Sequence, residues 1–151
     1  MTVQILGLIN LFFAGLLAGE ELMISFGVRG PLARLADRQH IELRQALILR
    51  LRVAVPMLFG LTFLTGAVVT WFGGYGHASD LRCAALIALA AFISVTLGGT
   101  VPINEAALGW DSAAPPADWR VQVNKWERLD TIRTAAALLA FALFLGATLQ
   151  R

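Results

Sequence analysis

The sequence predicts an all-α integral membrane protein, an antiparallel bundle of four transmembrane helices. The chain has 151 residues, of which 58% are hydrophobic and only 15% are charged. Soluble domains carry roughly a quarter charged residues, so this composition lies well outside their class. Four apolar runs are each long enough to cross a bilayer core of about 30 Å, which takes about 20 helical residues. A chain of this length has room for one compact domain.

The four spans are expected at about residues 3–28, 46–75, 81–103 and 127–149, with longer links at 29–45 and 104–126. The first run is interrupted by Asn10, and its only charged residues are the adjacent pair Glu20 and Glu21. It has no preceding Lys or Arg and is too long for the apolar region of a signal peptide, so we expect an uncleaved span. The second run contains 23 consecutive uncharged residues, Val53–Tyr75.

The positions of the basic residues predict how the bundle is oriented. Ten of the twelve lie in residues 29–52 or 102–133, which leaves only Arg82 and Arg151 for the opposite side. Cytoplasmic links of membrane proteins are enriched in Lys and Arg. We therefore expect both links in the cytoplasm and both termini outside, in a bacterial-type plasma (inner) membrane. The lipid bilayer is the expected partner, and a net charge of +2 gives no indication of nucleic acid binding.

Glu20 and Glu21 are the least expected residues in the first span. A charge at the bilayer centre costs at least about 2.5 kcal/mol, so these carboxylates should face the bundle interior. The small residues Gly15 and Gly19 allow a second helix to approach closely on the same stretch. Matching the depths of the four spans predicts one polar cluster near the cytoplasmic end, formed by Glu20, Glu21, Arg50, Arg52, Asn104, Glu105, Asp130 and Arg133. Such a cluster is either an ion-pair network that fixes helix packing or a polar pocket.

Tryptophans flank this cluster in the sequence. Trp110, Trp119 and Trp126 lie in or beside the second long link. Tryptophan prefers the headgroup level, so a membrane-interface belt is one interpretation. The other interpretation is that Trp110 and Trp126 cap a pocket and contact a bound ligand, together with Arg52 and Glu21.

Neither a metal site nor a cofactor is predicted. Cys83 is the single cysteine, and the two histidines, His40 and His77, are expected on opposite sides of the membrane. Carboxylate-bridged metal sites in bundles use Glu-x-x-His pairs, and the sequence has none. The oligomeric state has no signal in the sequence.

Two segments resemble a known family. "GTVPINEAALGW" and "PPADWRVQVNKWERLDTIRT" are similar to segments of small four-span membrane proteins, a family of unknown function that includes the anthrone oxygenases. The resemblance covers essentially the whole chain, and its most specific parts are V-P-x-N at 101–104 and the spacing from Trp126 to Arg133. Many members have a histidine near the position of Asp130. The resemblance implies cofactor-independent oxygenation of anthrones to anthraquinones, with Asn104, Trp126 and Arg133 as motif positions.

Two functional hypotheses follow. In the first, the protein is an enzyme in which Glu20 or Asp130 is the general base for an apolar aromatic substrate. Arg133 and Asn104 then stabilise the developing oxyanion. In the second, the protein is a non-catalytic membrane module or a subunit of a larger membrane complex, and the buried charges serve packing alone.

Overall fold

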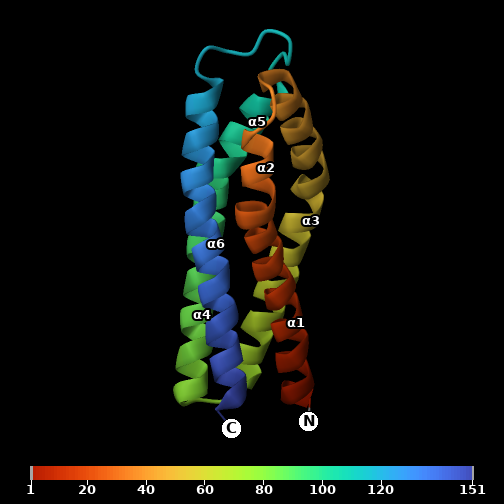
Figure 1. The fold of residues 1–151 in the computed structure, drawn as a ribbon. Coiled ribbons are helices and arrows are strands. Elements are labelled where there is room, and N and C mark those ends of the chain that lie inside the picture. The colour runs from red at the N-terminus through yellow and green to blue at the C-terminus, as the bar shows by residue number, and fades with distance from the viewer. Residues whose placement is uncertain (1, 151) are drawn as a thin grey trace.

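The computed structural model describes the backbone of residues 2–150 and the side chains of residues 3–150, all built from helices and their connections. Four helical rods run antiparallel, and the first begins at the same end of the molecule at which the last one finishes (Figure 1). The first rod is α1 (Thr2–Leu22), η1 (Met23–Val28) and α2 (Arg29–Ala33); the second is α3 (Asp37–Phe72); the third is α4 (His77–Val95), η2 (Thr96–Thr100) and α5 (Val101–Leu108); the fourth is α6 (Trp119–Leu149).

Each rod is long and apolar enough to cross a membrane. Large apolar side chains such as Phe12, Leu64 and Ile87 are exposed along the outside of the bundle, where a soluble protein would place polar residues. Lipid tails solvate such a surface. The predicted fold class, an integral membrane bundle of four antiparallel helices, is confirmed.

The centre of the bundle is packed with small side chains. Its core consists of Ala14, Leu17, Ala85, Ala88, Leu89, Phe92, Ala137, Ala140 and Phe144. Small residues let helices approach closely, which is the main source of helix association in lipid. Of the two glycines predicted to serve this purpose, Gly15 does so, since a Cβ built there would lie 3.3 Å from the ring of Phe141. Gly19 has open space around it and supports no close contact.

Two rods change from α-helical to π-helical hydrogen bonding for about one turn. At the end of η1 the N–H of Arg29 donates to the carbonyl of the residue five positions earlier, and the N–H of Val101 does the same at the end of η2. Such π segments are rare and widen the helix locally, and they are common at functional sites. The rods therefore depart from regular α-helical geometry at two defined places.

A glycine and a proline accompany each π segment. Proline has no N–H, and its ring clashes with the carbonyl of the residue four positions earlier. That residue is Gly27 for Pro31 and Gly98 for Pro102. The wider π register gives this carbonyl room to tilt. The spacing Gly-x-x-x-Pro thus accounts for the position of both irregular turns.

A second, smaller core lies at the end of the bundle away from the termini. α3 has 36 residues, or roughly 54 Å at 1.5 Å per residue, so it extends well beyond a bilayer core of about 30 Å. Its first turns pack against α5, α6 and the 109–118 link. The core there consists of Ile41, Ala107, Trp110, Trp119 and Val123. Trp110 and Trp119 are therefore buried in protein rather than in a membrane-interface belt.

Candidate functional site

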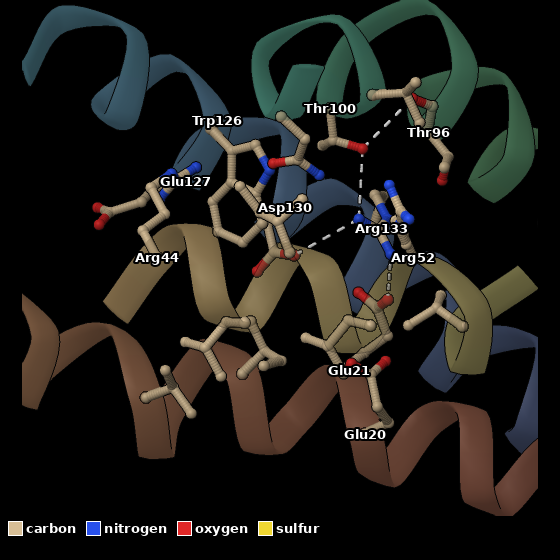
Figure 2. A pocket seen from close by; sticks show the side chains of 18 of the residues that line it. Glu20, Glu21, Arg44, Arg52, Thr96, Thr100, Trp126, Glu127, Asp130 and Arg133 are labelled. Atoms are coloured by element: carbon tan, nitrogen blue, oxygen red, sulfur yellow. Dashed lines mark hydrogen bonds and ion pairs between the residues drawn. The ribbon is translucent and has the colours of Figure 1, made fainter. Parts of the chain in front are cut away.

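A cavity of about 330 Å³ lies inside the bundle, in the half away from the chain termini. Its volume is at the lower end of the range of about 300–1,000 Å³ that small-molecule sites occupy. All four rods contribute to its wall, from which the charged and polar side chains project (Figure 2). The lining residues are Glu20, Glu21, Ile24, Val28, Arg29, Leu32, Arg44, Leu47, Ile48, Leu51, Arg52, Val55, Pro56, Thr96, Thr100, Val101, Asn104, Glu105, Leu108, Trp126, Glu127, Asp130 and Arg133.

The cavity lies where three of the four rods are irregular. Residues of η1 and η2 line it, and so does Pro56, which stands inside α3. Because proline has no N–H, the carbonyl of Arg52 loses its helical partner at this level. Irregular backbone is tolerated at membrane depth where it lines a cavity. The prolines thus place irregular backbone at the level of the cavity.

Arg133 is the central cation of the site. It projects from α6 and is 6% exposed. Its Nη2 donates to Glu21 on α1, and its Nη1 donates to the Thr100 hydroxyl on η2 at 3.3 Å (Figure 2). The guanidinium carbon lies 4.8 Å from the ring centroid of Phe92. One arginine therefore joins three rods around the inner end of the cavity.

Asp130 is the most fully engaged carboxylate. It is 1% exposed and forms an ion pair with Arg29, while a second, longer approach of 3.9 Å joins it to Arg133. The Ser25 hydroxyl donates to the same carboxylate at 3.1 Å. Two cations and a hydroxyl thus occupy Asp130, which leaves it little capacity to accept a further proton from a ligand.

Glu20 and Glu21 differ in how many partners their carboxylates have. Glu21 is 1% exposed, and one of its oxygens accepts the hydrogen bond from Arg133. Glu20 is half-buried, and within the described chain it lies within 4 Å of no cation. Its Oε2 is buried without a hydrogen-bond partner. The Oε2 of Glu21 is also unpartnered, but its other oxygen is held by Arg133; Glu20 combines an unpartnered buried oxygen with the absence of any ion pair among the described residues.

Unpartnered buried polar atoms gather around this cavity. Nine such atoms occur among the described side chains, and all except the Nε2 of His40 belong to cavity-lining residues. They include the Oδ1 of Asn104, the Nε1 of Trp126 and two nitrogens of Arg44. Buried polar groups in native proteins are nearly always hydrogen-bonded, so this concentration indicates a site that a polar ligand completes.

The structure brings together seven of the eight predicted site residues. The residues that line the one cavity are Glu20, Glu21, Arg52, Asn104, Trp126, Asp130 and Arg133. Trp110 does not line it, because its ring packs edge-on against Trp119 in the second core. Arg50, which depth matching placed in the polar cluster, is exposed and outside the cavity lining.

Two arginines of the site were not identified from the sequence. Arg29 lies at the end of the expected first span and was assigned to the link, yet it pairs with Asp130. Arg44 shares one helical face with Leu47, Ile48 and Leu51, all of which line the cavity. The sequence contains a signal for Arg44: apolar residues follow it at i+3, i+4 and i+7, the pattern of a helix face that points into the bundle.

Comparison with known proteins places the chain in a family. No curated protein and no solved structure matches the chain. The family model described as anthrone oxygenase matches residues 46–143, well over half of the chain. The match includes Asn104, Trp126, Asp130 and Arg133, whereas Glu20 and Glu21 lie before it. The chain belongs to the anthrone oxygenase family.

Proposed function

We propose that this membrane protein oxygenates an apolar, anthrone-type aromatic, with Glu20 as the general base. The observation that carries the proposal is the contrast among the buried acids of the cavity. Glu21 and Asp130 each form an ion pair with an arginine, whereas Glu20 forms none among the described residues and has a buried, unpartnered Oε2 on the cavity wall. A base in such surroundings is free to take a proton from a bound carbon acid. Family membership supplies the reaction class.

The chemistry balances without an external reductant. Glu20 takes one proton from the methylene carbon opposite the anthrone carbonyl, which leaves a carbanion delocalised onto the carbonyl oxygen. The carbanion forms a carbon–oxygen bond with dioxygen, and the proton returned by Glu20 gives a hydroperoxide. Removal of the second hydrogen from this carbon breaks the oxygen–oxygen bond, forms the new carbonyl and expels hydroxide, which is protonated to water. One anthrone and one dioxygen give one anthraquinone and one water.

The remaining residues bind and stabilise the reacting molecule in this proposal. Charge moves onto the substrate carbonyl when the proton leaves, so hydrogen-bond donors aimed at that oxygen accelerate the step. Asn104 and Arg133 line the cavity and are the donors that we assign to it. Trp126 and Arg52 contact the rings, and Glu21 holds Arg133 in place. Trp110 supports the site from the second core rather than contacting the substrate.

The membrane is the expected source of the substrate. An apolar aromatic partitions into the bilayer, and the cavity lies among helices whose outer faces are apolar. We further propose that the protein lies in an inner membrane with both termini outside, because ten of its twelve basic residues lie in or beside the two longer links. The cavity then opens toward the cytoplasmic half of the bilayer. The proposed reaction calls for no redox cofactor.

Turnover of an anthrone by the purified protein tests the proposal. The protein in lipid nanodiscs should accelerate conversion of an anthrone to the anthraquinone, with one dioxygen consumed per quinone formed. Glu20→Gln should abolish the acceleration, and Glu42→Gln, at an exposed glutamate outside the cavity, should keep it. Equal rates with wild-type protein and with empty nanodiscs would refute the proposal. A partner chain retained in native mass spectra would then identify a subunit of a larger complex.

A further inference from the structure

Arg44 is a buried cation with no anionic partner. Its side chain projects from α3 into the cavity wall and is 5% exposed. Within the described chain no carboxylate lies within 4 Å of it, and its Nε and Nη2 are buried without hydrogen-bond partners. A buried charge is costly unless it is paired and hydrogen-bonded. The folded protein therefore holds an arginine whose donors no protein group uses.

The surroundings of Arg44 hold its position without neutralising it. Its guanidinium carbon lies 4.5 Å from the ring centroid of Trp126, and that of Arg29 lies 5.8 Å from the same ring. Stacking on an aromatic face stabilises a guanidinium but leaves its in-plane N–H donors free. Glu127 and Asp130 act on Arg44 only from beyond 4 Å. Asp130 is in any case paired with Arg29.

The two ends of the cavity offer different chemistry. Arg44 and Trp126 lie together at one end, whereas Glu20 and Glu21 lie at the other, with Asp130 between them (Figure 2). At the first end the unpartnered atoms of Arg44 and Trp126 are N–H donors, whereas at the second the two glutamates have unpartnered carboxyl oxygens beside the unpartnered Nε of Arg133, a cation that is already paired with Glu21. A ligand that satisfies both ends has an oxyanion at one edge and an acidic C–H bond at the other.

We infer that Arg44 and Trp126 form an oxyanion-binding subsite, so that the substrate is an aromatic carbon acid with an ionised acidic group on its ring system. This inference rests on the proposed function for the identity of the ring. It adds a determinant of substrate choice: Arg44 binds the oxyanion and thereby places the reacting carbon at Glu20. Arg44 is a binding residue in this arrangement and takes no part in proton transfer.

Binding of unreactive product analogues tests the subsite. The probes are the 1- and 2-carboxylates of anthraquinone and their methyl esters, measured by quenching of tryptophan fluorescence in nanodiscs. Hydrogen bonds to charged groups are among the stronger ones in proteins. Wild-type protein should therefore bind at least one carboxylate about 10- to 100-fold more tightly than its ester. Arg44→Gln should remove this preference and leave the affinity for the ester within about threefold, and Arg44→Lys should keep part of it.

A matched control separates Arg44 from general electrostatic attraction. Arg50→Gln removes an exposed arginine from the same helix and should leave the carboxylate preference unchanged. Absence of any preference in wild-type protein, or a preference that survives in folded Arg44→Gln, would overturn the subsite. Turnover of an anthrone is measured separately. A carboxylate preference that depends on Arg44 in a protein without turnover would refute the proposed reaction and retain the subsite. Failure of all four probes to bind would overturn both.

Discussion

Glu20 and Glu21 are neighbours in the chain, yet their carboxyl groups lie in different surroundings. Adjacent residues on a helix point about 100° apart. Both line the cavity with an unpartnered Oε2, but the other oxygen of Glu21 accepts a hydrogen bond from Arg133 on α6, whereas Glu20 forms no ion pair among the described residues. One helical turn thus supplies both a structural acid and an available one. The two positions should respond differently to the same substitution.

Glu20→Gln should abolish oxygenation while the fold is retained. A general base contributes typically 10²- to 10⁴-fold to a rate, so the rate of anthrone oxidation should fall at least 100-fold. Because Glu20 has no ion-pair partner to lose, the free energy of unfolding should change by less than about 1 kcal/mol. Oxygen uptake and denaturant titration in detergent micelles measure the two quantities. A folded Glu20→Gln variant with wild-type activity would refute the assignment of the base.

Glu21→Gln should lower stability. The substitution removes the carboxylate that faces Arg133 in a buried pair, and loss of one partner from such a pair costs about 3–5 kcal/mol. Unfolding in a denaturant titration should therefore begin at a clearly lower concentration than for Glu20→Gln. The same loss of stability in both variants would contradict the division of roles between the two glutamates.

Hydrophobic runs and basic residues were sufficient to predict the fold class, because a bilayer imposes length and polarity on every span. The π segments were not predicted, since they depend on local steric conflict rather than on periodicity. Their signal was nevertheless present: Gly27 and Gly98 each stand four residues before a proline. Of the two glycines that the small-residue spacing predicts at a close helix contact, only Gly15 lies at one, since a Cβ there would meet Phe141 whereas a Cβ at Gly19 would meet open space.

The depths of the charged residues in the four spans predict most of the site, because charges buried in lipid must pair at one level. It could not choose among arginines of similar depth, since rotation about the helix axis decides which of them faces inward. Arg133 faces Glu21, while Arg50 points out of the bundle. Arg44 is absent from the predicted cluster because it lies in the part of α3 for which the sequence predicts a link. Trp110 was assigned to the pocket, and only tertiary packing reveals that it belongs to a second core.

Gly99→Ala should disturb the packing of η2 against α6, whereas Gly98→Ala should not. A Cβ at Gly99 would lie 2.8 Å from Leu129 of α6, next to Asp130, while a Cβ at Gly98 would meet open space. Forcing atoms into a packed contact costs about 1–3 kcal/mol. Thermal unfolding should therefore occur at a lower temperature in Gly99→Ala only. Equal stability of the two variants would show that Leu129 moves aside without cost.

The orientation predicted from the basic residues can be measured by labelling single cysteines. In a Cys83→Ser background, Tyr75→Cys places a thiol in the short exposed link and Ala113→Cys places one in the long link. A membrane-impermeant thiol reagent should label position 75 in intact cells and position 113 only after lysis. The reverse pattern would place both termini in the cytoplasm.

The ion pair between Arg29 and Asp130 should be strongly coupled, in contrast to the exposed pair between Arg120 and Asp37. The side chains of the first pair are 17% and 2% exposed, and those of the second are 60% and 49% exposed. A double-mutant cycle with Arg29→Gln and Asp130→Asn should give a coupling free energy of about 1–3 kcal/mol. The corresponding cycle for the exposed pair should give less than about 1 kcal/mol, because solvent screens it. Raising the salt concentration should reduce the second coupling and leave the first nearly unchanged. Equal couplings would show that the Ser25 hydroxyl and Arg133, rather than Arg29, hold Asp130 in place. Asp130 would then have more freedom to take part in proton transfer.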